Sequence, residues 1–340
     1  MSEAIARARA AAAALRGARS RPPAPGADRF FFVVGRAKSG TTWLERTLDA
    51  HPEILCRGEG RFFGREQPLG AARGRSLLGI LGRSEELREW TGRSVWTRGG
   101  GGEERLTEIA GAAARELMGA ELARSGKRLA GDKTPLMAPT VVGEIAAACP
   151  GARIVHIVRD GRDVAVSSAH HVWNLLDDQP ERQRDRADQL AIRDSYRADP
   201  DAFKAGGRSI FAPGELERSA RDWADVTLAA REQGSSLGEK LYAEVRYEEL
   251  LARGSEELAR ILEFLGADAS DDVIERCLRS TDFERLSGGR ASGEEDSTAF
   301  LRSGTAGGWR EVFTPDDREA FKRGAGGALR QLGYERDGGW

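Results

Sequence analysis

The stretch F-V-V-G-R-A-K-S-G-T-T-W, residues 32–43, contains the residue types that bind a phosphate group. An apolar run leads into a Gly-rich turn, and two threonines begin a helix after it. Backbone N–H groups of such a turn and of a helix N-terminus bind anions, and Lys38 adds a positive charge. In a nucleoside-triphosphate loop the lysine directly follows the second glycine. Here Thr41 follows Gly40 and the lysine lies inside the turn, so we expect a different phosphate ligand.

A second candidate segment is I-V-H-I-V-R-D-G-R-D-V-A-V-S-S, residues 154–168. Arg159 comes just after a predicted strand, and Ser167 follows eight residues later on the next helix. An arginine at a strand end and a serine from the adjacent helix can bind one phosphate group. The alternative is an Arg–Asp pair on the surface that involves Asp160 or Asp163.

A third candidate segment is F-L-R-S-G-T-A-G-G-W-R, Phe300 to Arg310. Two Gly-containing turns frame Arg302, and the segment is too polar for a core. The alternative interpretation is a flexible surface loop.

Taken together, these segments resemble the sulfotransferase family that uses 3′-phosphoadenosine-5′-phosphosulfate (PAPS). K-S-G-T-T-W resembles the 5′-phosphosulfate loop of that family, and R-D-G-R-D-V-A-V-S resembles its 3′-phosphate segment. R-S-G-T-A-G-G-W-R resembles its C-terminal R-K-G-x-x-G-x-W-K loop, although Ser303 replaces the lysine and puts one charge contact in doubt. The resemblance implies PAPS as co-substrate, no metal, and these ligand-binding residues: Arg36, Lys38, Ser39, Gly40, Thr41, Thr42, Trp43, Arg159, Ser167, Thr281, Phe283, Arg302, Ser303 and Gly304.

Two aromatic residues match the positions at which the family holds adenine. Trp43 follows the phosphosulfate loop, and S-T-D-F supplies Thr281 and Phe283 before the C-terminal loop. Stacking of a base on an aromatic ring contributes about 1–3 kcal/mol. The alternative for each aromatic side chain is packing in the core.

Sulfuryl transfer to an alcohol needs a base that removes the hydroxyl proton. The cytosolic branch of the family uses a histidine in a K-T-H-like segment, but this chain has K-T-P, with Pro135 at that position. In the carbohydrate and tyrosyl-protein branch, a glutamate shortly after D-A-H-P is the base, and Glu59 matches it. The resemblance therefore implies Glu59 as base, with Lys38 and Lys133 as catalytic cations. The alternative for Glu59 is a solvated loop carboxylate.

The predicted function is sulfuryl transfer from PAPS to a hydroxyl of a carbohydrate, a small molecule or a peptidyl tyrosine. One alternative is a P-loop nucleotide kinase, which would need Mg²⁺; the displaced lysine argues against it. The other is a non-catalytic nucleotide-binding relative, which Ser303 alone favours. His170 and His171 either line the acceptor pocket or lie on a helix surface, whereas His51 and His156 are predicted to be structural.

Strands alternate with helices along the chain, which indicates an α/β fold with a parallel sheet covered on both faces. The predicted strands are Phe30–Val34, Arg153–Val158 and the segment 240–247. The fold class is P-loop NTPase-like, a three-layer α/β/α arrangement. Residues 1–28 are predicted to be a helical or disordered arm, and 29–340 a single domain with insertions at about 60–102 and 173–213, the second a mobile lid.

The composition excludes several classes of protein. Net charge is −2 among 340 residues, which indicates neither nucleic acid nor a membrane surface as partner. No apolar run approaches the roughly 18 residues of a membrane span. The three cysteines fit neither a metal site nor a disulfide framework, so we expect a reducing, cytoplasmic location.

Overall fold

The structure is a computed structural model that describes residues 26–65, 76–95, 102–179, 183–281 and 305–340. The described residues form two compact units. The first contains the residues up to Val158 together with Asp225–Thr281, and the second contains Arg159–Ala224 together with the residues after Thr281. The prediction of a single domain from 29 to 340 stays a prediction.

The first unit is built on a five-stranded parallel sheet in the order β2-β3-β1-β4-β5. The strands are β1 (Phe30–Arg36), β2 (Ile54–Gly58), β3 (Leu129–Leu136), β4 (Arg153–Val158) and β5 (Tyr242–Arg246). The chain leaves β1 toward β2 on one side and returns past β1 to β4 on the other. Ligands of open parallel sheets bind where the strand order reverses, at the carboxyl ends of the strands. In this sheet that place is the carboxyl end of β1.

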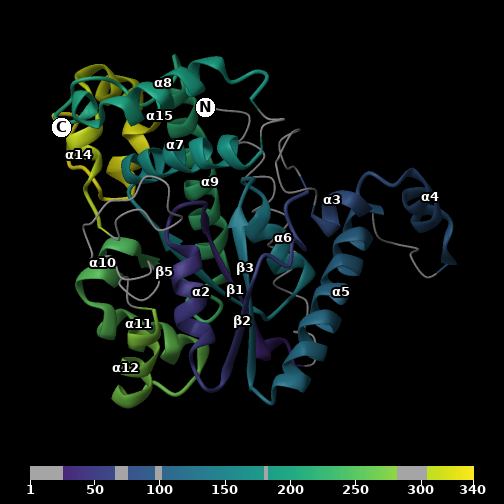
Figure 1. Cartoon of the computed structure of the whole chain (residues 1–340). Helices are drawn as coiled ribbons and strands as arrows, with labels where there is room; N and C mark the ends of the chain where they lie inside the picture. The colour runs from purple at the N-terminus through teal and green to yellow at the C-terminus, as the bar shows by residue number, and fades with distance from the viewer. Residues whose placement is uncertain (1–25, 66–75, 96–101, 180–182, 282–304) are drawn as a thin grey trace. The chain divides into compact units, whose positions relative to one another are not determined.

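Helices cover both faces of the sheet (Figure 1). The helices of the first unit are α2 (Thr41–Asp49), α3 (Leu77–Leu81), α4 (Glu85–Arg93), α5 (Gly102–Ser125), α6 (Val141–Ala148), α10 (Tyr247–Ala252), α11 (Gly254–Leu265) and α12 (Asp271–Ser280), with the second half of α9 (Glu215–Leu237). α2, α10, α11 and α12 pack on one face, and α5, α6 and α9 pack on the other. The predicted α/β/α layers and parallel sheet are confirmed.

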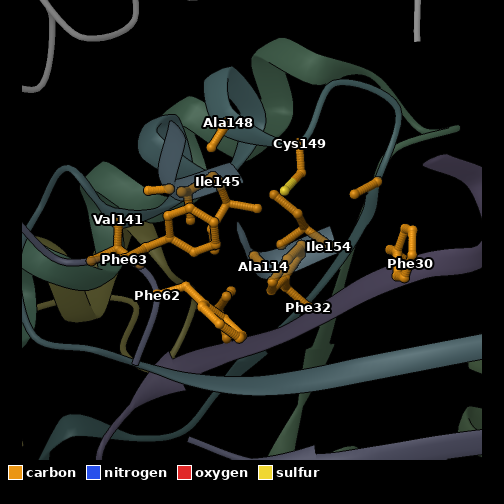
Figure 2. Close-up of a cluster of buried hydrophobic side chains, with 14 of the residues drawn as sticks. Phe30, Phe32, Phe62, Phe63, Ala114, Val141, Ile145, Ala148, Cys149 and Ile154 are labelled. Carbon is orange, nitrogen blue, oxygen red and sulfur yellow. The ribbon is translucent and has the colours of Figure 1, made fainter. Parts of the chain in front are cut away.

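β1 supplies apolar side chains to both faces because successive side chains of a strand point to opposite sides. Phe31 and Val33 enter the cluster beneath α2 and α11, whereas Phe32 and Val34 enter the cluster beneath α5 and α6. Figure 2 shows Phe32 in this second cluster with Phe62 and Phe63, which come from the loop after β2. Both faces of β1 are thus buried, and this packing holds in place the end of β1 from which the loop begins.

A lysine holds the turn between α2 and β2. Lys127 Nζ donates to the backbone carbonyl oxygens of Asp49, His51 and Ile54, at 2.9, 3.1 and 2.6 Å. His51 is fully buried beside it, and its ring contacts the carbonyl of Asp268 at 2.8 Å. His51 is therefore structural, as predicted.

The second unit is helical and has an aromatic core. Its elements are α7 (Gly161–Asp178), α8 (Ala187–Ala198), a 3₁₀ turn (Pro200–Phe203), the first half of α9, α14 (Trp309–Val312) and α15 (Pro315–Gln331). The ring centroid of Phe313 lies 5.6 Å from that of Trp309 and 5.9 Å from that of Phe321, and both Trp309 and Phe321 are buried. Thr314 begins α15 with a capping box and Pro315 in the first turn.

The structure adds local structure that the sequence did not indicate. β2 and β3 were not predicted; Glu59 directly follows β2, and β3 contains Lys133. Part of the charged stretch predicted as a mobile lid is helical, since α7 continues to Asp178 and α8 follows, and the role of that stretch as a lid stays a prediction. None of the helices among the described residues is both long and apolar enough to cross a bilayer.

Candidate active site

Two glycines shape the loop after β1. A Cβ at Gly35 would lie 2.6 Å from the carbonyl oxygen of Ile157, and one at Gly40 would lie 2.5 Å from the ring of Tyr247. Gly40 also has a φ of +95°, in the left-handed region that favours glycine. The loop can therefore close only with glycine at these positions, which is the physical basis of its Gly-x₄-Gly spacing.

The loop presents the N-terminus of α2 as an anion site. Ser39 N–H donates to Arg36 O at 3.0 Å and closes the turn. The first turn of α2 contains no acidic residue, and no side chain caps the helix. The unpaired N–H groups and the dipole of the helix therefore remain available to an anion. Thr41 and Thr42 begin this helix, as predicted.

Lys38 lies in the loop with a φ of +74°. Four non-glycine residues of the described chain have such a φ, namely Lys38, Glu59, Arg61 and Ala205. A non-glycine residue in this region costs about 1–3 kcal/mol and often marks a functional site. Two of the four are thus residues to which the sequence assigned a catalytic role.

Trp43 and Thr281 are brought together. The indole N–H of Trp43 donates to the carbonyl of Thr281 at 3.0 Å, which fixes the ring at the start of α2. The Thr281 hydroxyl is buried and contacts Thr47 Oγ1 at 2.8 Å. The geometry therefore supports a structural role for the Thr281 side chain, and the adenine contact of Trp43 stays a prediction.

Lys133 connects the anion loop to Glu59. Its Nζ lies 3.2 Å from Thr42 Oγ1 and 3.3 Å from Glu59 Oε1. Lys133 is buried, and the Glu59 side chain is 21% exposed. A buried ammonium, a carboxylate open to solvent and an anion site therefore meet at the carboxyl edge of the sheet.

Glu59 is positioned by backbone contacts on both sides. Glu59 N–H donates to Lys133 O at 3.0 Å, continuing the β2–β3 ladder. The next N–H, of Gly60, donates to Asp132 Oδ1 at 2.7 Å. The chain then crosses the end of β3, because Phe62 and Phe63 enter the opposite core cluster, where Phe63 lies 5.6 Å from Phe32 (Figure 2). These two anchors fix the loop that carries Glu59.

Asp132 was missed by the sequence reasoning. It is buried, and its second oxygen accepts from Thr134 Oγ1 at 2.6 Å. Burial raises the pKa of Asp132, while the Thr134 and Gly60 donors oppose that rise. The signal that could have found it is an acid directly before Lys133 in G-D-K-T, since a buried carboxylate needs donors nearby.

In the second unit, the charged residues of R-D-G-R-D mainly hold the protein together. Asp163 accepts from the N–H groups of Gly307 and Trp309, at 2.7 and 3.0 Å. Arg162 is buried, bonded to Asp160 at 2.7 Å, and its guanidinium lies 3.9 Å from the Trp309 ring. An Arg–Asp pair is thus present in this segment, but it joins Arg162 to Asp160 and is buried rather than at the surface.

Arg159 is also buried, and its Nη2 donates to the carbonyl of Thr305 at 3.0 Å. Ser167 lies half-buried on α7, two turns after the N-terminus of that helix. The 3′-phosphate role of both residues stays a prediction. Phe283, Arg302, Ser303 and Gly304 lie outside the described residues.

The histidines fall into different environments. His156 is fully buried on β4 and contacts Tyr242 Oη at 2.7 Å, so it is structural, as predicted. His170 is buried between Trp173 and Tyr196, with ring centroids at 4.7 and 5.2 Å. His171 is half-buried on the same helix. Within the described ranges, no three His, Cys, Asp or Glu side chains are grouped to hold a metal ion.

Comparison with known proteins agrees with this geometry. The sulfotransferase family profile matches residues 31–211, and the sulfotransferase domain profile matches residues 138–333. Sulfotransferase 1A1 of Canis lupus familiaris is 21% identical over 178 residues, 50% of this chain and 52% of the relative. The chain thus matches about half the length of this curated relative.

Solved structures of the same kind are similar over most of the chain. The sulfotransferase domain from the curacin biosynthetic pathway has a TM-score of 0.50 and 16% identity, covering 93% of this chain and 99% of that one. A mouse sulfotransferase, SULT7A1, crystallised with PAP, has a TM-score of 0.47 and 19% identity, covering 91% and 86%. At 16% identity, the likeness to the curacin-pathway domain shows the fold alone.

Proposed function

Because the chain belongs to the sulfotransferase family, we propose that it transfers a sulfuryl group from PAPS to a hydroxyl group of an acceptor. The observation that carries the proposal is the position of Lys133, 3.2 Å from Thr42 of the anion loop and 3.3 Å from Glu59. Lys133 thereby contacts both the proposed phosphosulfate-binding loop and the proposed general base, Glu59.

The N–H groups of the loop and of α2 would hold the 5′-phosphosulfate. Lys38 would stabilise the bridging oxygen that leaves with the phosphate, and Lys133 would stabilise the sulfuryl oxygens. Glu59 would take the proton of the acceptor hydroxyl as its oxygen attacks sulfur. The bond between sulfur and the bridging oxygen would break, and 3′-phosphoadenosine-5′-phosphate would depart with the electron pair.

The acceptor is proposed by class only: a sugar, a small-molecule alcohol or a peptidyl tyrosine. A base that is a carboxylate rather than a histidine supports this range, as the sequence resemblance implied. The comparison of 4-nitrophenol, a tyrosine peptide and N-acetylglucosamine as acceptors of ³⁵S-labelled sulfuryl from PAPS would separate the three classes.

Binding of the donor can be tested without an acceptor. We expect 3′-phosphoadenosine-5′-phosphate to bind the purified, metal-free protein in isothermal titration, and ATP to bind far more weakly with or without Mg²⁺. Tight Mg²⁺-dependent binding of ATP alone would instead support a nucleotide kinase and would overturn the proposal.

The base has a matched control because two glutamates flank β2. Glu59 follows the strand, whereas Glu53 precedes it and is paired with Arg128 at 2.9 Å. We expect Glu59→Gln to lower kcat by about 10²–10⁴-fold, and Glu53→Gln to leave kcat within about threefold, since surface substitutions usually change little. A Glu59→Gln enzyme with near-wild-type turnover in single-turnover assays would rule out Glu59 as base.

A further inference from the structure

Glu45, on α2, has no role in the proposed reaction, yet it faces the same ammonium. Residues three and four apart lie on one face of a helix, and Thr42, Glu45 and Asp49 form such a row on α2. The row faces β2 and β3, because Thr42 contacts Lys133 and Asp49 accepts from Cys56 N–H at 2.9 Å. Glu45, between them, therefore points to the same edge of the sheet.

Gly58, the last residue of β2, lies next to both charged groups. The position of a Cβ on Gly58 lies 3.5 Å from Glu45 Oε2 and 3.6 Å from Lys133 Nζ. The Glu45 carboxylate and the Lys133 ammonium thus lie close to the same point, on the side of Gly58 where a side chain would be. Among the residues that the structure describes, Glu45 has no hydrogen-bond donor to its carboxylate, so its interaction with Lys133 acts through space.

We propose that Glu45 is a positioning residue for Lys133, drawing the ammonium partly away from Glu59 and so keeping Glu59 available as a base. The proposal rests on the proposed function. Lys133 faces two carboxylates, one in contact at 3.3 Å and one across Gly58. A cation shared by two anions holds each of them less tightly than it would hold one, because like charges raise each other's affinity for protons.

The other charged groups around this pair do not replace Glu45. On α2 they are Arg46 and Asp49, on β2 Arg57, and on β3 Asp132. Burial raises the pKa of Glu45, and Lys133 is the main group that opposes the rise. Asp49 is already bonded to Cys56, and Asp132 to Gly60 and Thr134. Glu45 thus differs from these two carboxylates, because its principal interaction with a cation is with Lys133 and no donor of the described residues is bonded to it.

The consequence for the reaction concerns the moment at which the donor arrives. The sulfuryl oxygens would attract Lys133 toward the anion loop, where Thr42 already contacts it. Glu45 would keep a counter-charge beside the ammonium during this shift, while Glu59 is released to accept the acceptor proton. No bond of Glu45 forms or breaks.

The test is the pH titration of the Glu59 carboxyl, followed by ¹³C NMR in protein labelled at the glutamate side-chain carboxyl carbons. Comparison with Glu59→Gln assigns the signal. In Glu45→Gln we expect Glu59 to titrate about half a pH unit lower, because Lys133 then interacts with Glu59 without the competing charge of Glu45. The control is Glu116→Gln, an exposed residue of α5, which should leave the titration unchanged.

The same variant should shift the acid limb of the kcat profile in the same direction and lower kcat about three- to tenfold, with the Kd for 3′-phosphoadenosine-5′-phosphate within twofold of wild type. An unchanged Glu59 titration in Glu45→Gln would overturn the proposal; if that variant did not fold, Glu45→Ala would be titrated instead. The titration needs neither donor nor acceptor. A wild-type protein without transfer activity would therefore refute the proposed function, while the titration would still decide whether Glu45 acts on Lys133 and Glu59.

Discussion

The loop after β1 and the segment after β4 both carry the charged residues and glycines expected of phosphate binding, but they use them differently. In the loop after β1, the turn is closed by the backbone and by two sterically required glycines, and the first turn of α2 has no acid. Its donors therefore remain available. In R-D-G-R-D, Asp160, Arg162 and Asp163 are all bonded within the second unit.

The difference shows that charge in a motif does not by itself indicate contact with a ligand. Asp163 and Arg162 hold the start of α14 and Trp309 in place. Replacing the lysine of the first loop should therefore change catalysis, whereas replacing one of its two required glycines should also change stability. Replacing a charged residue of the second segment should change stability first.

Among substitutions in these two segments, the largest effect is expected at Lys38. Lys38→Ala removes a cation proposed to stabilise the leaving oxygen, so kcat should fall about 10²–10³-fold. The Kd for 3′-phosphoadenosine-5′-phosphate should rise less than tenfold, since the N–H groups of the loop remain. Single-turnover kinetics and isothermal titration measure the two quantities. Equal losses would mean that Lys38 serves binding only.

Gly40→Ala should destabilise the protein by about 3 kcal/mol, from the φ of +95° together with the contact of a new Cβ with Tyr247. Gly126→Ala is the control, since Gly126 also has a positive φ but has no atom within 4 Å of the Cβ position. It should cost about 1 kcal/mol. Urea denaturation gives both values, and equal costs would show that the Tyr247 contact does not matter.

Asp163→Asn should cost about 2 kcal/mol, because the carboxylate accepts from two backbone N–H groups and an amide can accept with only one oxygen. The exposed Asp185 offers a control in Asp185→Asn, which should change stability by under about 0.5 kcal/mol. Thermal unfolding followed by circular dichroism compares them. A neutral Asp163→Asn would mean that Gly307 and Trp309 are held by other contacts.

The strands that lead to the two segments also differ, since β4 buries His156 whereas the paired Val34 of β1 is apolar. Burial, with a smaller contribution from Arg231, lowers the pKa of His156 to about 3. Between pH 6.5 and 3 the unfolded chain binds one more proton than the folded chain. Stability should therefore fall as pH falls through this window, by about 1.4 kcal/mol per pH unit from this residue.

His156→Gln removes that titration. Its free energy of unfolding, measured in urea at pH 7, 6 and 5, should decline less steeply than that of the wild type. Parallel declines would contradict the assignment of this acid sensitivity to His156.

The sequence predicted the parts of the fold whose residues are apolar and continuous. β4 has the predicted bounds, and β1 extends the predicted strand by two residues. The loop between β1 and α2 was also predicted, since its glycines determine it.

β3 could not be predicted from its pattern, because L-A-G-D-K-T-P-L contains a glycine, two charges and a proline. The structure explains each. Gly131 leaves room for the ring of Phe31, whose atoms lie 2.2 Å from the Cβ position. The carbonyl of Lys133 points toward β2, and residues two apart in a strand point to the same side. The position of the N–H that Pro135 lacks is therefore on the β2 side. No hydrogen bond to β2 is lost there, because β2 ends at Gly58. A polar strand next to a site cannot be recognised by hydrophobicity.

The candidate site was predicted in its residues rather than in its geometry. Glu59 and Lys133 were each inferred from motifs, but their contact depends on the pairing of β2 with β3. Glu45 and Asp132 interact with residues that are distant in sequence. Their positions in the sequence therefore do not indicate these interactions.

The turn that leads into β2 is held by a cation that the chain itself supplies. The Lys127 ammonium is a compact positive charge surrounded by the carbonyl oxygens of Asp49, His51 and Ile54. It thus takes the place that a bound potassium ion could take among these oxygens. Because this charge is covalently tethered, its local concentration does not depend on the salt in solution. Glu59 follows the strand that begins at this turn. Dilution, dialysis or a chelator thus cannot remove the cation that holds the turn, as they could remove a bound metal ion.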